Sequence, residues 1–280
     1  MNTILKFIAL AFVASTVCGS RCLADDEQFK KTGREVYDKH SDSVLFVTFT
    51  VKINMQLSGQ GHQAHEQSLE SLGTVIREDG LILIPNSSID IAGQIRAQLQ
   101  QSAPPDLKFD ITTTAKNIKV ILPDGSEVKA DLVLQDADLD LAFIMPEPPG
   151  DGEEPVSWKP VTLAKDAPRQ RVLDDIFILG RLDRNVNRMA NIRVGRIESA
   201  IRRPRLIYRT NVPALGVPSF NTDGEMTGVF VRQTTGPGAG QFIIRPPKDV
   251  IKIVEQINEK AEDNGEGEAE EEGEVEESKE

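Results

Sequence analysis

Short runs of apolar, β-branched and aromatic residues, separated by turn residues, recur along most of the chain. The first two are residues 44–53 and 73–77, and residues 58–68 between them are predicted to form a polar turn or loop. The later runs are residues 81–84, 118–122, 128–134, 141–145, 175–179, 191–200, 206–210, 226–231 and 241–244. Asp-Gly pairs at Gly80 and Gly125 supply hairpin turns. About a dozen short strands without long helices between them predict an all-β barrel or sandwich.

Three segments break the strand pattern and favour helices. Residues 25–40 are polar with scattered aromatic and apolar positions, which indicates a short amphipathic helix. Residues 89–102 carry apolar side chains four apart before a Pro-Pro pair, although Gly93 weakens this helix. Residues 250–257 form an apolar face behind the helix-starting Pro246 and Pro247.

Charge is unevenly distributed along the 280 residues. The formal net charge is −12, and residues 262–280 alone contribute eleven acids against one lysine. Blocks of like charge with few apolar residues do not offset the entropy of ordering, so a disordered acidic tail is predicted over 262–280. The acidic balance argues against non-specific binding to nucleic acid.

The N-terminus has the composition of a secretory signal peptide. Lys6 precedes an apolar stretch over residues 7–18, which is too short to span a bilayer. Residues 1–24 are therefore predicted to be removed after Ala24, with Gly19 as the alternative cleavage site and a lipid on Cys18 as a minor alternative. We expect a secreted or periplasmic protein with no cysteine and no transmembrane segment.

Five segments, taken in order, resemble the trypsin-like serine proteases of the HtrA/Deg family. They are residues 73–83 (GTVIREDGLIL), 132–144 (LVLQDADLDLAFI), 176–180 (IFILG), 223–228 (DGEMTG) and 242–246 (FIIRP). The resemblance runs from about residue 43 to residue 259. It implies an all-β, trypsin-like double β-barrel, with a C-terminal helix and any active site between the barrels.

Together with the charge and composition patterns, the resemblance predicts how the chain is organised. The predicted parts are a signal peptide (1–24), an N-terminal helical lead (25–42), a first β-barrel (43–145), a linker (146–160), a second β-barrel with the C-terminal helix (161–261) and the disordered acidic tail (262–280). The linker is rich in proline, glycine and acids, which is typical of a boundary. No PDZ domain is expected after the second barrel.

The same alignment indicates that the catalytic positions are degenerate. Ser87 falls where the family has its histidine, Asp140 at the aspartate and Leu215 at the nucleophile. Serine does not take up a proton near neutral pH, and leucine is no nucleophile. Pro213 falls at the oxyanion-hole position and has no N–H to donate. No functional catalytic residue is expected, and Asp140 is predicted to be a structural carboxylate.

Other candidate chemistry is weak. His62 and His65 beside Glu66 have Zn²⁺-ligand spacing only in a helix, whereas the segment is predicted to be an exposed loop without a third ligand, so no metal is expected. Ser219 lacks the flanking glycines of a nucleophile turn and is predicted to be a strand residue. No phosphate-binding loop is present, and no cofactor is expected.

A run of arginines is the remaining signal. Nine lie between residues 181 and 209, at 181, 184, 188, 193, 196, 202, 203, 205 and 209, against only Asp183 and Glu198. They indicate either a solvated strand face or a docking surface for an acidic partner or the chain's own tail. Arg202, Arg203 and Arg205 are the candidate binding residues. Without interleaved aromatic residues, nucleic acid is not favoured.

Together these patterns predict a secreted or periplasmic pseudoprotease that binds a protein or peptide partner. Two other functions remain open at this stage. One is an active serine endopeptidase with an unrecognised nucleophile. The other is an acidic, cation-buffering or envelope protein that uses its barrels only as a stalk. The sequence does not predict the oligomeric state.

Overall fold

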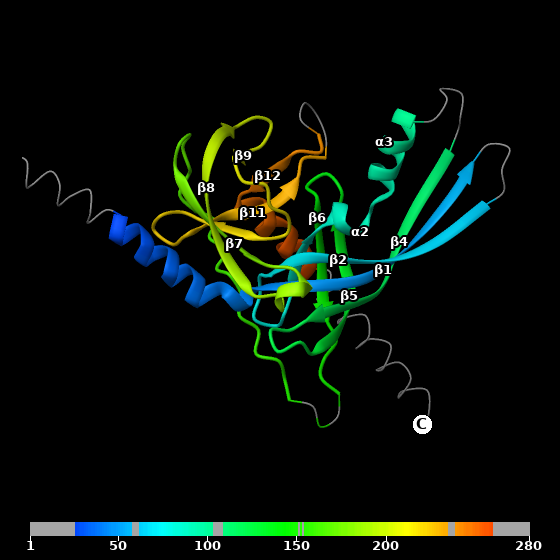
Figure 1. The fold of residues 1–280 in the computed structure, drawn as a ribbon, viewed down its shortest axis with the longest axis horizontal. Coiled ribbons are helices and arrows are strands. Elements are labelled where there is room, and N and C mark those ends of the chain that lie inside the picture. The colour runs from blue at the N-terminus through cyan, green and yellow to red at the C-terminus, as the bar shows by residue number, and fades with distance from the viewer. Residues whose placement is uncertain are drawn as a thin grey trace, which may run out of the picture.

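The chain folds into two closed antiparallel β-barrels of six strands each, seen side by side in the computed structural model (Figure 1). The structure describes residues 26–57, 62–102, 109–150, 152, 154–234 and 239–259. The predicted signal peptide with its cleavage site, both cysteines and the acidic tail lie outside these ranges. The predicted all-β double barrel is confirmed.

Each barrel is built from consecutive strands. The first contains β1 (Val44–Leu57), β2 (His62–Val75), β3 (Ile82–Pro85), β4 (Phe109–Ile121), β5 (Glu127–Asp136) and β6 (Leu141–Pro146), in the spatial order β1-β2-β3-β6-β5-β4. The second contains β7 (Asp175–Arg181), β8 (Ala190–Ile201), β9 (Ile207–Thr210), β10 (Pro218–Phe220), β11 (Met226–Arg232) and β12 (Phe242–Arg245), in the order β10-β11-β12-β9-β8-β7.

Strands β3 and β6 are buried on both faces, and this joins the two barrels. Ile82 and Ile84 of β3 belong to the core of the first barrel, whereas Leu83 between them packs in the core that includes the second barrel. On β6, Ile144 and Phe143 divide in the same way. Because successive side chains of a strand point to opposite faces, an uninterrupted apolar strand serves two cores.

Helices cover the second barrel at both ends of the described chain. Residues 26–40 are helical and continue into η1 (Ser41–Ser43), and residues 247–259 form the second helix. Val36 of the first and Val250 of the second are buried in the same core cluster. The ring of Phe29 lies 4.7 Å from that of Phe177 on β7. Both helices agree with the amphipathic patterns.

The predicted helix over 89–102 forms from residue 92 onward, and a separate single turn precedes it. α2 (Asn86–Ile89) follows β3 directly, and α3 (Ala92–Ser102) begins after a break at Asp90. Ala92 is buried in the core of the first barrel, against which Ile95 and Leu99 also pack. The guanidinium of Arg96 donates to the carbonyl of Ile111 on β4 at 2.6 Å. Helix α3 therefore lies against the first barrel.

The predicted loop over 58–68 is wrong from residue 62 onward, because that part belongs to β2. Strands β1 and β2 pair continuously from Val44↔Thr74 to Gln56↔His62. Figure 1 shows β1, β2 and β4 projecting beyond the barrel as a long arm beside α3. The side chains of residues 63–68 are exposed, so no apolar alternation marks this half of the strand. Backbone pairing with β1 holds this half of β2 in the strand conformation instead.

Among the described helices, none combines the length and the apolar character needed to cross a bilayer.

Candidate functional site

Ser87 and Asp140 meet at the end of the β3–β6 pair. Pro85 of β3 faces Leu141 of β6, so the residues just beyond this pair lie close together. The backbone N–H of Ser87 donates to Oδ1 of Asp140 at 2.6 Å, and its hydroxyl donates to Oδ2 at 3.1 Å. The alignment with the HtrA/Deg motifs predicted that these two positions lie close together.

The carboxylate of Asp140 is fully buried between the barrels. The backbone of Asp140 is in the left-handed region, with φ of 57°, and the residue has no exposed surface. Besides Ser87, the backbone N–H of Arg232 on β11 of the second barrel donates to Oδ2. Burial raises the pKa of Asp140, whereas the hydrogen bonds from Arg232 and Ser87 oppose this shift. The carboxylate thus accepts hydrogen bonds from both barrels.

Arg245 supports the same turn from the second barrel. Its side chain is almost fully buried, and Nε donates to the carbonyl of Leu139 at 3.0 Å. Nη1 forms an ion pair with Asp249, four residues further along the chain in the C-terminal helix, at 3.2 Å. The sequence analysis did not single out this residue. An arginine in an otherwise apolar strand, four residues before an aspartate, was the signal that could have found it.

The segment with Leu215 approaches the same region from the second barrel. Gly216 has φ of +73°, and a Cβ atom placed on it would lie 2.0 Å from the carbonyl oxygen of Leu72. The same atom would lie 3.1 Å from Cδ of Pro85, two residues before Ser87. The hydroxyl of Thr74 donates to the carbonyl of Gly216 at 3.0 Å. The base, acid and nucleophile positions of the alignment therefore gather at one interface.

Leu215 itself is half-buried, and Pro213 is exposed. The carbonyl of Pro213 accepts a hydrogen bond from Nη1 of Arg193 at 3.3 Å. Since the proline nitrogen carries no hydrogen, this position contributes no backbone donor to the interface.

Another serine near the predicted nucleophile position is inaccessible. Ser219 is fully buried in β10, and its hydroxyl lies 2.6 Å from that of Thr227. It also donates to the carbonyl of Gly228 at 3.1 Å. The prediction that Ser219 is an ordinary strand residue is confirmed.

Neither histidine with a described side chain lies at Asp140. His40 is buried, and its ring stacks on Phe220 of β10 with a centroid distance of 4.9 Å. His65 is exposed on the arm, where it pairs with Ile53 of β1. Within the ranges that the structure describes, no cluster of three His, Cys, Asp or Glu side chains is placed to hold a metal ion.

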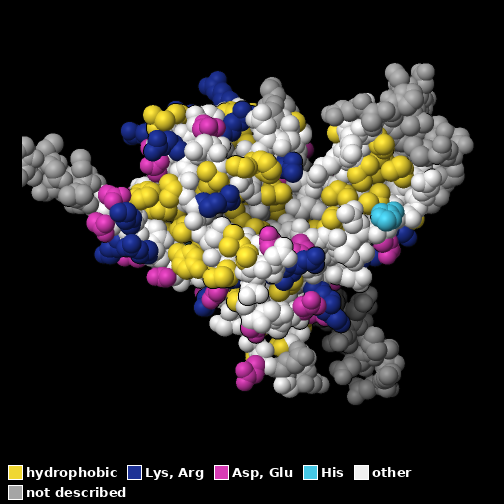
Figure 2. Space-filling model, viewed as in Figure 1, with side chains coloured by type: hydrophobic (Ala, Val, Ile, Leu, Met, Phe, Trp, Pro, Cys, Tyr) yellow, Lys and Arg dark blue, Asp and Glu magenta, His cyan; other side chains and the backbone are white. Residues whose placement is uncertain are grey.

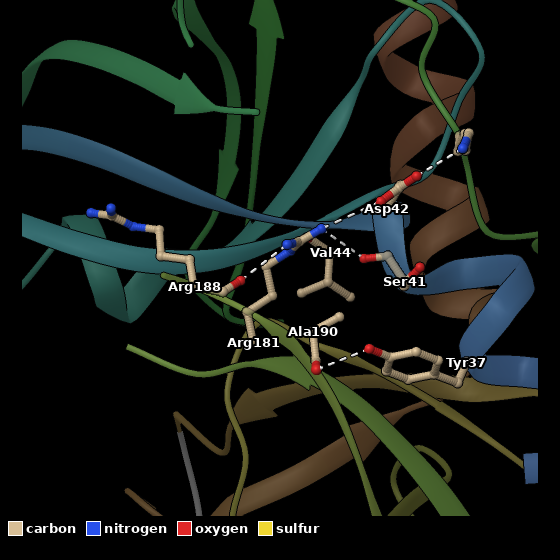
Figure 3. A network of polar contacts seen from close by, with 8 residues as sticks. Tyr37, Ser41, Asp42, Val44, Arg181, Arg188 and Ala190 are labelled. Atoms are coloured by element: carbon tan, nitrogen blue, oxygen red, sulfur yellow. Dashed lines mark hydrogen bonds and ion pairs between the residues drawn. The ribbon is translucent and has the colours of Figure 1, made fainter. Parts of the chain in front are cut away.

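The arginine run does not form one surface. Arg202, Arg203 and Arg205 are exposed in the connection between β8 and β9, whereas the Arg181 side chain is only 9% exposed. Figure 3 shows Arg181 among backbone carbonyls of the N-terminal segment and β1. Arg188 forms an ion pair with Glu70 at 2.9 Å. The nine arginines therefore do not share one solvated or docking face, and that interpretation is wrong for Arg181 and Arg188, which have partners inside the fold.

Comparison with known proteins supports the fold. No protein-family model matches the sequence, and no curated protein matches it. Among solved structures, the HtrA-type protease AlgW, determined with a tripeptide, aligns with a TM-score of 0.52 and 16% identity over 80% of this chain and 63% of that one. Deg5 aligns with a TM-score of 0.49 and 18% identity over 80% of this chain and 92% of its own.

The chain thus spans less than two thirds of the length of AlgW. At 16% identity the likeness to AlgW shows the class of fold alone, which is the trypsin-like double β-barrel of HtrA-type proteases.

Proposed function

We propose that the protein is an exported pseudoprotease, a trypsin-like double barrel that binds a protein or peptide partner without cleaving it. The observation that carries the proposal is the side chain opposite Asp140. A serine hydroxyl occupies the place where triad chemistry requires an imidazole, and it donates its hydrogen to the carboxylate. This hydroxyl has no proton-accepting capacity near neutral pH that could activate a nucleophile.

Two further positions support the same conclusion independently. Leu215 has no nucleophilic atom, and Pro213 has no N–H for an oxyanion hole. The buried hydroxyl of Ser219, hydrogen-bonded to Thr227 and Gly228, does not replace them. The rival function, an active endopeptidase with another nucleophile, would need a different set of residues.

The decisive experiment measures hydrolysis and covalent labelling of the purified mature protein. We expect no casein cleavage above buffer and no labelling by a serine-reactive fluorophosphonate. In proteases lacking one triad member, a residual rate about 10³ to 10⁴ over water persists, and each oxyanion donor is worth about 10² to 10³. Loss of both should bring the rate to background. Labelling of any serine by the unmodified protein would support the rival function.

A restoration series serves as the control. The single change Leu215→Ser should not restore cleavage, because Ser87 supplies no base and Pro213 supplies no donor. The triple change Ser87→His, Pro213→Gly and Leu215→Ser, with Asp140 retained, is the smallest set that supplies every missing group. Cleavage by the single variant would contradict the proposal.

Export is part of the proposal. Intact-mass analysis of protein recovered from the producing cells should show a mature chain that begins at Asp25 and lacks both cysteines. A retained Cys18 carrying a lipid would replace the secreted or periplasmic form with a membrane-anchored one.

For the partner, we propose that the exposed arginines of the β8–β9 connection, Arg202, Arg203 and Arg205, supply binding residues for an acidic surface. Exposed guanidinium groups pair with carboxylates in two-pronged geometry and attract them over several ångströms. Replacing the three with glutamate should weaken retention of the protein by an acidic resin at low salt. Unchanged retention would exclude them as binding residues.

A further inference from the structure

A cavity of about 510 Å³ opens on the surface of the second barrel, and neither Ser87 nor Asp140 lines it. Three segments that are distant in the sequence line it: residues 165–169 before β7, residues 204–206 between β8 and β9, and residues 246–252 at the start of the C-terminal helix. Figure 2 shows Lys and Arg side chains gathered around the end of this barrel where β8 and β9 meet. The walls combine proline rings with long cationic side chains.

The lining of this cavity is predominantly cationic. Its charged members are Lys165, Arg169, Arg205, Lys248 and Lys252 against Asp166 and Asp249. Asp249 is already paired with the buried Arg245, and Lys165 is paired with Glu255 at 2.7 Å.

The other four cations, Arg169, Arg205, Lys248 and Lys252, form no ion pair with another residue in the described part of the chain. All four are exposed at the rim of the cavity. Like charges gathered in a concave site repel one another and create a positive potential that attracts an anionic ligand.

The chain itself carries a segment of matching charge. Residues 262–280 contain eleven acids and one lysine, including the consecutive glutamates Glu270, Glu271 and Glu272. This segment follows the helix whose first turns line the cavity.

The length of the segment allows it to return to the cavity. From residue 247 to residue 259 the helix rises only about 20 Å. The 21 residues beyond it span up to about 70 Å when extended. Attachment to the same chain gives an effective concentration of the order of millimolar, so even weak ionic contacts populate the bound state.

We propose that the acidic segment 262–280 occupies this basic cavity in its own chain. The cavity volume accommodates a few glutamate side chains, which would neutralise the unpaired cations on its rim. An acidic partner that uses this end of the barrel must then compete with the segment. The proposal concerns a site separate from Asp140 and holds whether or not the protein hydrolyses peptides.

Zero-length carbodiimide cross-linking of the full-length mature protein tests the proposal directly. The reagent joins lysine to carboxylate only when the two are in contact, and mass spectrometry identifies the pairs. At about 20 mM salt we expect cross-links from Lys248 and Lys252 to glutamates of residues 262–280, at least five-fold more frequent than from Lys116, an exposed lysine on the first barrel. At about 500 mM salt they should decline, because exposed ion pairs are screened.

A pair of arginine variants supplies the matched comparison, since arginine does not react with the reagent. Arg169→Glu combined with Arg205→Glu should reduce the Lys248 cross-links at least five-fold, whereas Arg184→Glu, an exposed change outside the cavity, should leave them unchanged. Circular dichroism verifies that each variant is folded.

Three results would overturn the proposal. The first is equal reactivity of Lys116 and Lys248 towards the acidic segment. The second is cross-linking that Arg169→Glu with Arg205→Glu does not change. The third is cross-links found only between isotopically light and heavy copies in a mixed sample, which would place the segment on a second molecule.

Discussion

His40 is a buried, neutral imidazole at the end of the N-terminal helix. It is 5% exposed, stacks on Phe220, and its Nδ1 atom has no hydrogen-bond partner within the described structure. Burial, helped by the nearby positive charge of Lys39, lowers the pKa of His40 from 6.5 to about 4. The folded protein therefore disfavours the charged form, which the unfolded chain accepts readily.

This shift predicts a loss of stability on mild acidification. Between pH 6.5 and about 4 the unfolded state binds a proton at His40 that the folded state does not, so the free energy of unfolding falls as the pH falls through this window. His40→Phe keeps an aromatic ring against Phe220 and removes the titration. Urea unfolding at pH 7 and pH 5 should show a smaller loss in this variant than in the parent.

His65→Gln, on the exposed arm, is the control and should retain the parent's loss. The raised pKa of Asp140 acts in the opposite direction, since protonation of that group favours the folded state, but it is present in all three proteins and cancels in the comparison. Identical pH dependence of His40→Phe and the parent would refute the assignment.

Gly216 is a position where the absence of a side chain lets the two barrels pack closely. Its positive φ disfavours a side chain, and a Cβ atom would lie 2.0 Å from a backbone oxygen of β2. Gly216→Ala should therefore lower the free energy of unfolding by about 3 kcal/mol or more, because the barrels must separate locally. Gly125→Ala has a similar φ of +88° with open space around it, and should cost only about 1 kcal/mol. Equal thermal melting temperatures for the two variants would contradict this account.

At the scale of elements, the strands that enclose a core were predictable and the outer arm was not. Ile82 and Ile84 signal β3 because they are buried. The outer halves of β2 and β4 carry mostly polar side chains, so their strand character comes from pairing with β1. Asn117, with φ of 51°, lies where the β1–β4 register shifts, and this bulge also interrupts the alternation. A sequence pattern records burial more directly than it records backbone pairing.

Arg181, at the end of β7 in the second barrel, binds the segment that leads into β1 of the first barrel. Its guanidinium donates to the carbonyl of Val44 at the start of β1, to that of Ser41 at 2.9 Å and to that of Arg188 at 3.0 Å (Figure 3). Asp42 lies 3.6 Å from Nη2. Burial lowers the pKa of this arginine, while the Asp42 charge opposes the shift. The planar guanidinium thus binds three carbonyls on two segments, residues 41–44 and residue 188.

Arg181→Lys should destabilise the protein by about 2 to 4 kcal/mol, because one ammonium group does not reach all three carbonyls. Arg196→Lys is the matched control. Arg196 pairs with Asp175 at 2.7 Å on the exposed face of the same barrel, where solvent screens the pair and leaves it little effect on stability. Denaturant unfolding of both variants measures the difference. An equal loss of unfolding free energy in both variants would mean that Arg181 stabilises the protein no more than the exposed Arg196 does.

At the scale of the whole molecule, polar contacts from the second barrel converge on one turn of the first. Arg232 donates its backbone N–H to Asp140, and Arg245 donates to the carbonyl of Leu139. The hydroxyl of Thr234 donates to the carbonyl of Asp138 at 2.9 Å. The turn that carries Asp140 is therefore a polar connection between the barrels.

The sequence predicted only part of this arrangement. Ser87 and Asp140 were brought together by the alignment, because each follows a recognisable strand motif. The contributions of Arg232 and Arg245 depend on how two barrels dock, and the contact of Arg232 is made by a backbone N–H that carries no side-chain signal. The basic cavity likewise joins residues from three distant segments. Contacts of this kind follow from tertiary geometry, and apart from the arginine in the apolar strand β12 they leave no local pattern.

Asp140→Asn tests whether the Asp140 carboxylate holds the two barrels together. The groups that face the Asp140 carboxylate all donate hydrogen bonds to it. The NH₂ group of an asparagine would replace one carboxylate oxygen and point its own hydrogens at these donors. Buried donors would then lose their acceptor. We expect the free energy of unfolding to fall by about 2 to 4 kcal/mol. We also expect the calorimetric enthalpy to exceed the van't Hoff enthalpy, because the barrels would no longer unfold together. Asp138→Asn, exposed on the same turn, should stay within about 0.5 kcal/mol of the parent and keep a single transition. A single cooperative transition in Asp140→Asn, with stability equal to that of Asp138→Asn, would show that the barrels are held together by their apolar contacts alone.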